Sequence, residues 1–163
     1  MARHKNIPLR ELNYHYHPSV MALIQAQPFT LSAQGGLADI DDLTLEALLS
    51  DITLHTTLPE PEAPYCLLCF DPLFEFLKQH PGAKRHHVRL YFHEHEDVAI
   101  NTLNLIQPAL THQLSSLSLP SLALRQERLK DLAPTPQKRV PTKAKLAKWA
   151  GVTPSALRAC HKE

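Results

Sequence analysis

The apolar residues of this chain recur in short runs of different spacing, which predict a mixture of strands and helices. In "HHVRLYF", the apolar residues Val88, Leu90 and Phe92 alternate with His87, Arg89, Tyr91 and His93, a pattern typical of a half-buried strand. "YCLLCF", residues 65–70, is a continuous apolar run that favours a strand buried on both faces. Residues 71–85 separate the two strands and are long enough for a crossover, so we predict a βαβ unit with parallel strands.

Helical spacing and capping residues mark the other elements of this region. "NIPLREL", residues 6–12, is consistent with a short edge strand, and Pro18 suits the first turn of a helix in "HPSVMALIQAQ". "DPLFEFLKQH" predicts a helix that Asp71 caps and Pro72 opens. "DIDDLTLEALLSDI" predicts a helix capped by Asp41 or Asp42, with one apolar face made by Leu45, Leu48, Leu49 and Ile52.

The pattern changes after "EDVAINTLNLIQPAL", which predicts a helix that Pro108 kinks or ends, with a stripe of Ala99, Leu103, Ile106 and Leu110. "SSLSLPSLALRQERLKDL" predicts a loop and then a helix, and "APTPQKRVP", with its three prolines, predicts a linker. We therefore expect a mixed α/β (or α+β) domain at residues 1–132 with a small mixed sheet, a proline-rich linker at 133–141, and an all-helical segment at 142–163.

The last segment has the features of a helix-turn-helix. Thr142 can cap a helix over "KAKLAKWAG" that ends at Gly151, and Thr153 can cap a second helix beginning at Pro154. Helices that cross steeply need a small residue where their backbones meet, and Ala147 stands at that place. The second helix should pack on "LALRQERLKDL" or on a partner subunit, and the other positions expected to point inward are Leu146, Ala150, Val152, Leu157 and Cys160.

The charge distribution favours a polyanion as partner of this segment. Residues 121–163 hold ten lysines and arginines and three acidic residues, whereas the rest of the chain has a net charge of −6. Arginine can pair with a guanine edge, serine can bond a base or a phosphate, and lysines can contact phosphates. The candidate DNA-binding residues are Lys138, Arg139, Lys143, Lys145, Lys148, Thr153, Ser155, Ala156, Arg158 and His161. The alternatives are a solvated basic tail and a tail that docks on an acidic protein.

The order of these elements resembles that of the ParB-like partition proteins, which have a ParB/sulfiredoxin-like domain followed by a DNA-binding module. The resemblance rests on "NIPLREL", "YCLLCF", "HHVRLYF", "EDVAINTLNLIQ" and the two terminal helices. That family has a Gly-Glu-Arg-Arg type stretch for nucleotide phosphates after the buried strand, where this chain has "CFDPLFEFL", with the acidic Asp71 and neither glycine nor arginine. No nucleotide-binding or catalytic residue can be transferred, so we expect a scaffold or interaction domain without a cofactor.

The cysteines, the histidines and one aromatic stretch could each bind a metal or a ligand, but each has a simpler structural interpretation. Cys66 and Cys69 point to opposite faces if they lie on a strand, so we interpret them as buried structural cysteines and expect no metal site. His87, His93 and His95 could share a strand face and bind a metal, but a solvated polar face explains them as well. "YHYHP", residues 14–18, could stack on bases, although a loop lying on the domain is the simpler interpretation.

We therefore predict a DNA-binding protein of plasmid or mobile-element maintenance, or of transcriptional control. Double-stranded DNA is its expected partner and a homodimer its expected state, since helix-turn-helix proteins read two half-sites. No membrane partner is expected, because no apolar run approaches about 20 residues. The three cysteines do not indicate a disulfide framework, which favours the cytoplasm. An enzyme, including a metal-dependent one, is a weaker hypothesis than DNA binding or a protein-interaction module.

Overall fold

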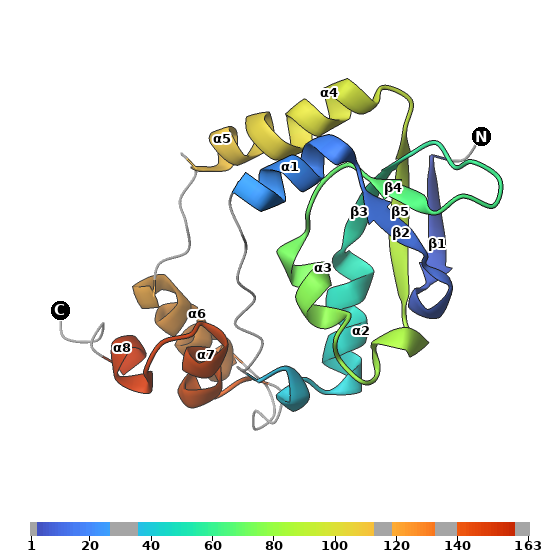
Figure 1. Ribbon diagram of the computed structural model, residues 1–163. Coiled ribbons are helices and arrows are strands. Elements are labelled where there is room, and N and C mark those ends of the chain that lie inside the picture. Colours follow the sequence, from blue (N-terminus) through green and yellow to red (C-terminus); the bar gives the residue numbers. More distant parts are fainter. Residues whose placement is uncertain (1–2, 27–35, 113–118, 133–139, 159–163) are drawn as a thin grey trace. The chain divides into compact units, whose positions relative to one another are not determined.

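The computed structural model describes residues 3–26, 36–112, 119–132 and 140–158. Residues 3–26 and 37–112 form one compact unit, and residues 36, 119–132 and 140–158 form a second (Figure 1). In the part of the chain so described, no helix is long and apolar enough to cross a membrane.

The first unit is built on a mixed sheet. Its strands are β1 (His4–Pro8), β2 (Tyr14–Tyr16), β3 (Thr53–Thr57), β4 (Tyr65–Leu67) and β5 (His87–His93), and their order in the sheet is β1-β5-β3-β4-β2. The pairs β3–β5 and β2–β4 are parallel, whereas β1–β5 and β3–β4 are antiparallel. The edge strand predicted at residues 6–12 is confirmed only in its first part. β1 pairs only with β5 among the described strands, but it ends at Pro8, and residues 9–11 form a 3-10 helix.

Helices flank this sheet at the predicted places. Asp41 caps the helix at 42–51 by accepting a 2.7 Å hydrogen bond from the Thr44 amide, and Asp71 caps the one at 72–77 with a 2.9 Å bond from the Phe74 amide. Both bonds satisfy amides that have no partner inside the helix. The helices of this unit are η1 (Leu9–Glu11), α1 (Pro18–Ala26), η2 (Leu37–Asp39), α2 (Asp42–Asp51), α3 (Pro72–Leu77), η3 (Ala83–Arg85), α4 (Glu96–Asn101), the π-helical η4 (Thr102–Ile106) and α5 (Gln107–His112).

The main core lies between one face of the sheet and helices α2 and α3 (Figure 1). Its side chains confirm the predicted apolar faces of β5 and α2. Burial of such side chains is the main stabilising contribution to a domain of this size. The core residues are Ile7, Leu45, Leu49, Ile52, Leu54, Leu67, Phe74, Leu77, Val88, Leu90 and Phe92.

Two predictions about the sheet are wrong. The parallel neighbour of β5 is β3 and not β4, so the expected βαβ unit from "YCLLCF" to "HHVRLYF" does not exist. β3 has the sequence TLHTT, with only Leu54 as an apolar residue, and its strand character comes from pairing on both sides. Tyr14–Tyr16, interpreted as loop, is strand β2, because it pairs along its length with β4.

The predicted stripe on residues 96–110 is correct only in its first half. Ala99 is buried and Leu103 packs beside it, but Ile106 and Leu110 are 52% and 63% exposed. The π-helical η4 between them bonds i to i+5, so the apolar face turns away from the 3.6-residue spacing after Leu103. Pro108 does not end the helix, which continues through α5.

The second unit contains α6 (Leu119–Leu132), α7 (Lys143–Trp149) and α8 (Pro154–Arg158). Ala123 of α6, Ala147 of α7 and Leu157 of α8 are fully buried against one another, with Leu119, Leu122, Leu146 and Val152 packed around them. The expected packing of the terminal helices on "LALRQERLKDL" is confirmed. The contacts thus group α6, which precedes the predicted linker, with α7 and α8, which follow it. Most of the predicted linker lies outside the described residues.

Candidate functional site

Helices α7 and α8 are joined by a turn of defined geometry. Gly151 has φ 69°, a left-handed conformation that glycine adopts without steric cost. The Val152 amide donates to the Ala147 carbonyl at 3.0 Å, and the Gly151 amide donates to the Lys148 carbonyl at 3.2 Å. These two bonds are those of a Schellman motif, and the packing of Val152 with Ala147 is the hydrophobic contact that accompanies it.

The start of α7 is also held in place. Thr142 accepts a 3.3 Å hydrogen bond from the Lys145 amide, which confirms it as the cap. On α6, Gln126 donates to the Pro141 carbonyl at 3.1 Å, and Glu127 forms a 2.9 Å ion pair with Lys143. These two contacts hold the N-terminal end of α7 against α6.

Most of the residues predicted to face inward do so. Ala147 and Leu157 are buried, and Leu146 and Val152 are half-buried in the same cluster. Ala150 is a correction, since it is exposed. It is the C-cap residue, where the chain already leaves the helix for the Gly151 turn. Cys160 lies outside the described residues.

Some of the predicted DNA-binding residues are exposed in the second unit. Lys145, Lys148, Thr153 and Ser155 are exposed, and the Thr153 and Ser155 hydroxyls lie 2.9 Å apart. Lys143 is half-buried in its ion pair with Glu127, and Ala156 is half-buried. Arg158 is the last residue of α8, and its side chain, like Lys138, Arg139 and His161, is outside the described part. We name Lys145, Lys148, Thr153 and Ser155 the basic ridge.

The stretch "CFDPLFEFL" of the first unit forms core and not a phosphate cradle. Phe74 is 1% exposed, and Asp71 uses its carboxylate to cap α3. Glu75 accepts a 2.8 Å hydrogen bond from the Tyr14 hydroxyl and a second from the Tyr16 hydroxyl. Lys78 completes the cluster, with its Nζ 2.5 Å from Glu75 Oε2. Sequence reasoning missed this cluster, although one glutamate in an otherwise apolar helix was a signal for it.

The cluster shifts the pKa values of its members. Burial by itself would raise the pKa of Glu75, but the hydrogen bonds from Lys78, Tyr16 and Tyr14 outweigh it and lower that pKa. Burial and the nearby Glu75 raise the pKa of Tyr16. Glu75 is therefore an ionised carboxylate at neutral pH, held by two phenols and an ammonium group.

We expect Glu75→Gln to lower the free energy of unfolding by about 1.5–3 kcal/mol at pH 7, because hydrogen bonds to a charged group are lost. The folded pKa of Glu75 is lowered, so the unfolded chain, with a carboxyl near pKa ~4.3, takes up a proton first as the pH falls. The contribution is thus present above ~pH 4.3 and is lost below it. Urea titrations from neutral to acid pH should show the two proteins converging. The matched control is Glu46→Gln, at an exposed position of α2.

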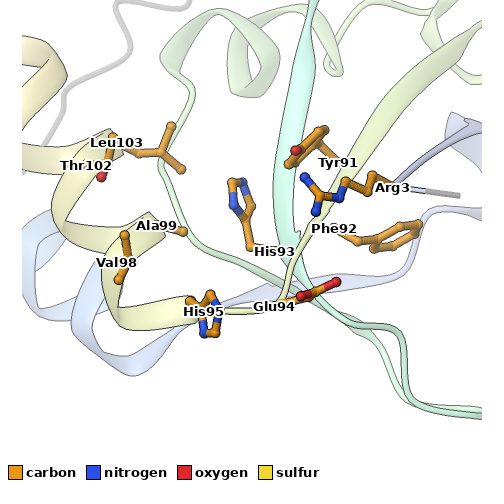
Figure 2. A pocket seen from close by; sticks show the side chains of 10 residues that line it. All are labelled: Arg3, Tyr91, Phe92, His93, Glu94, His95, Val98, Ala99, Thr102 and Leu103. Atoms are coloured by element: carbon orange, nitrogen blue, oxygen red, sulfur yellow. The ribbon is translucent and has the colours of Figure 1, made fainter. Parts of the chain in front are cut away.

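A second polar cluster lies on the opposite face of the sheet. His55 Nδ1 and His93 Nε2 are 2.9 Å apart, and the Tyr91 ring lies beside both. A pocket of about 320 Å³ opens at this end of β5, lined by Arg3, Tyr91, His93, Glu94 and residues of α4 (Figure 2). His87 and His93 share a strand face as predicted, but His95 does not, because it lies beyond β5 at the N-terminus of α4.

Cys66 and Cys69 are less buried than predicted. Cys66 and Cys69 are free and half-buried, not fully buried. Burial, together with the charges of Glu96 and Asp71, raises the pKa of the Cys66 and Cys69 thiols respectively. Among the residues that the structure describes, no three His, Cys, Asp or Glu side chains are grouped so as to hold a metal ion.

The fold of the chain is similar to that of a solved protein structure. No protein-family model and no curated protein matches the chain. A solved structure that it resembles is the C-terminally truncated chromosome-partitioning protein ParB from Caulobacter crescentus, complexed with CTP-gamma-S. The two are 17% identical with a TM-score of 0.51, over 96% of this chain and 76% of that one. The chain therefore has a ParB-like fold.

Proposed function

We propose that this protein binds double-stranded DNA, with α7 and α8 as a helix-turn-helix and the basic ridge as its contact surface. The observation that carries the proposal is the Schellman turn between the two helices, which packs Ala147 and Leu157 inward and leaves Lys145, Lys148 and Ser155 exposed. A second helix held at its N-terminus by such a turn can lie in a major groove, while the first contacts the backbone. In this arrangement the lysines neutralise phosphates and Ser155 lies near the bases.

The fold and the charge support a proposal for the biological setting. A ParB-like fold with a basic C-terminal segment suits a role in plasmid or mobile-element maintenance or in transcriptional control. We infer a homodimer that reads two half-sites, because one short recognition helix contacts few bases. The first unit would then serve as a scaffold or interaction domain and not as an enzyme, since Phe74 is buried in the core and the Glu75 carboxylate is held by Tyr14.

Lys145→Ala and Lys148→Ala test the proposal. Binding of a labelled duplex, measured by mobility shift over a series of salt concentrations, should weaken in each variant, and the slope of log K against log salt should fall by about one. Both lysines lie on the solvent side of α7, so folding should be unchanged. The matched control is Lys84→Ala, at an exposed position of η3 in the first unit.

Two results would count against the proposal. One is duplex affinity that is the same in Lys145→Ala, Lys148→Ala and Lys84→Ala. The other is full displacement of the duplex by polyglutamate at equal charge, which would favour the alternative of an acidic protein partner. Arg158→Ala, in the same assay, tests the predicted contact to a base edge and should weaken binding in a sequence-dependent way.

A further inference from the structure

In the first unit, the face of the sheet opposite to helices α2 and α3 carries aromatic and imidazole rings. Register places His4 of β1 and His55 of β3 on either side of Tyr91 of β5, and His93 follows two residues later on the same face. Ring centroids are 6.4 Å apart for His4 and Tyr91, 5.9 Å for His55 and Tyr91, and 4.8 Å for Tyr91 and His93. We name these four residues the ring face.

The four rings are at least partly exposed. His4 is exposed, and Tyr91, His55 and His93 are half-buried, partly by one another. The core side chains of the same strands point to the other face, where α2 and α3 lie (Figure 1). Burial, together with the charge of His93, lowers the pKa of His55, and burial lowers that of His93. The two imidazoles are therefore neutral at pH 7 and hydrogen-bond to each other, so they offer π surfaces and not charges.

Permanent positive charge borders this surface. Arg89 stands on the same face of β5 as Tyr91, and Arg3 lines the pocket with Tyr91 and His93 (Figure 2). Both arginines are exposed, and neither forms an ion pair with a residue in the described ranges. The outward positions of β1, β3 and β5 contain no aspartate or glutamate. Glu94, just after β5, is the carboxylate that lines the pocket.

We propose that the ring face binds single-stranded DNA, with bases stacked on Tyr91 and His4 and phosphates against Arg3 and Arg89. Rings with cationic neighbours are the combination by which proteins hold single strands, since every base has a π face and every linkage an anion. A duplex hides its base faces, so it cannot use this surface. The choice of DNA over RNA rests on the proposed function, in which the second unit binds duplex DNA.

The test uses the full-length chain and a fluorescein-labelled oligothymidine of about 12 nucleotides, within the ~4–16 nucleotides that such sites cover. Tyr91→Ala should weaken binding by about 5- to 150-fold, the loss of one base stack. Tyr91→Phe should retain wild-type affinity, and Arg89→Ala should lower the salt slope by about 0.7. Thr53→Ala is the matched control, because Thr53 pairs with Arg89 in register, faces the same way and has no ring.

Several results would overturn the inference. They are equal affinity of Tyr91→Ala and Thr53→Ala for oligothymidine, tighter binding of oligouridine RNA, and displacement of the oligothymidine by polyglutamate. Loss of oligothymidine binding in Lys145→Ala with Tyr91→Ala unaffected would also overturn it, since the basic ridge would then be the site. Duplex binding in the two lysine variants reports on the proposed function separately, so failure of one idea is distinguishable from failure of the other.

Discussion

The Phe74→Ala variant is expected to lose about 3–5 kcal/mol of unfolding free energy. Phe74 is 1% exposed and packs at the centre of the core between α3 and the sheet, with the Tyr14 ring 5.8 Å away in an edge arrangement. Truncation to alanine removes the favourable free energy of burying the aromatic ring. It also leaves a cavity, because the sheet on one side and the helix on the other cannot move together to fill it. A single domain of ordinary stability, about 5–15 kcal/mol, would be severely weakened.

The two units carry separate intrinsic probes for this measurement. The chain has four tyrosines, all in the first unit, and its one tryptophan, Trp149, is in the second. In Phe74→Ala, the denaturation transition seen by tyrosine fluorescence should move to a much lower urea concentration. The transition seen by tryptophan fluorescence should not move. Leu73→Ala, at a neighbouring residue that is 45% exposed, is the control and should shift little. An unchanged tyrosine transition in Phe74→Ala would mean that this stretch is not core and could line a ligand site.

The elements with local signals were predictable from sequence. The caps at Asp41 and Asp71 and the alternation along β5 each depend on neighbouring residues, and the structure confirms them. β2 and β4 have three residues each and β3 is mostly polar, so these strands are stabilised by their partners and not by their own pattern. The order of the sheet could not be inferred, because no local feature distinguishes β3 from β4 as the neighbour of β5.

In the candidate site, too, the residues with local sequence signals were predictable and the others were not. Thr142, Ala147 and Gly151 have roles set by helix and turn geometry, and these were found from spacing. Lys143 was predicted to contact phosphates, but Glu127, sixteen residues away on α6, pairs with it. The ring face joins residues from three strands whose pairing was unknown. Sequence spacing reveals sites made within one turn of chain, whereas sites made across strands need the fold.

Ala147→Leu is expected to destabilise the second unit by about 1–3 kcal/mol, because larger side chains force apart a packed contact. Ala147 is fully buried against Ala123 and Leu157, and its carbonyl accepts the amide of Val152 that closes the turn. The added atoms must displace α8 or open that bond. The Trp149 fluorescence transition should move to lower urea, and the tyrosine transition should not.

The same variant links packing to the proposed function. If α8 is presented to DNA by its packing on Ala147, duplex affinity should fall in Ala147→Leu even in salt and urea conditions where the unit remains folded. Ala150→Leu is the matched control: it makes the same change three residues along, at an exposed position, and should leave stability and affinity near wild type. Equal duplex affinity of the two variants would show that DNA binding does not depend on the position of α8. The helix-turn-helix proposal would then be wrong.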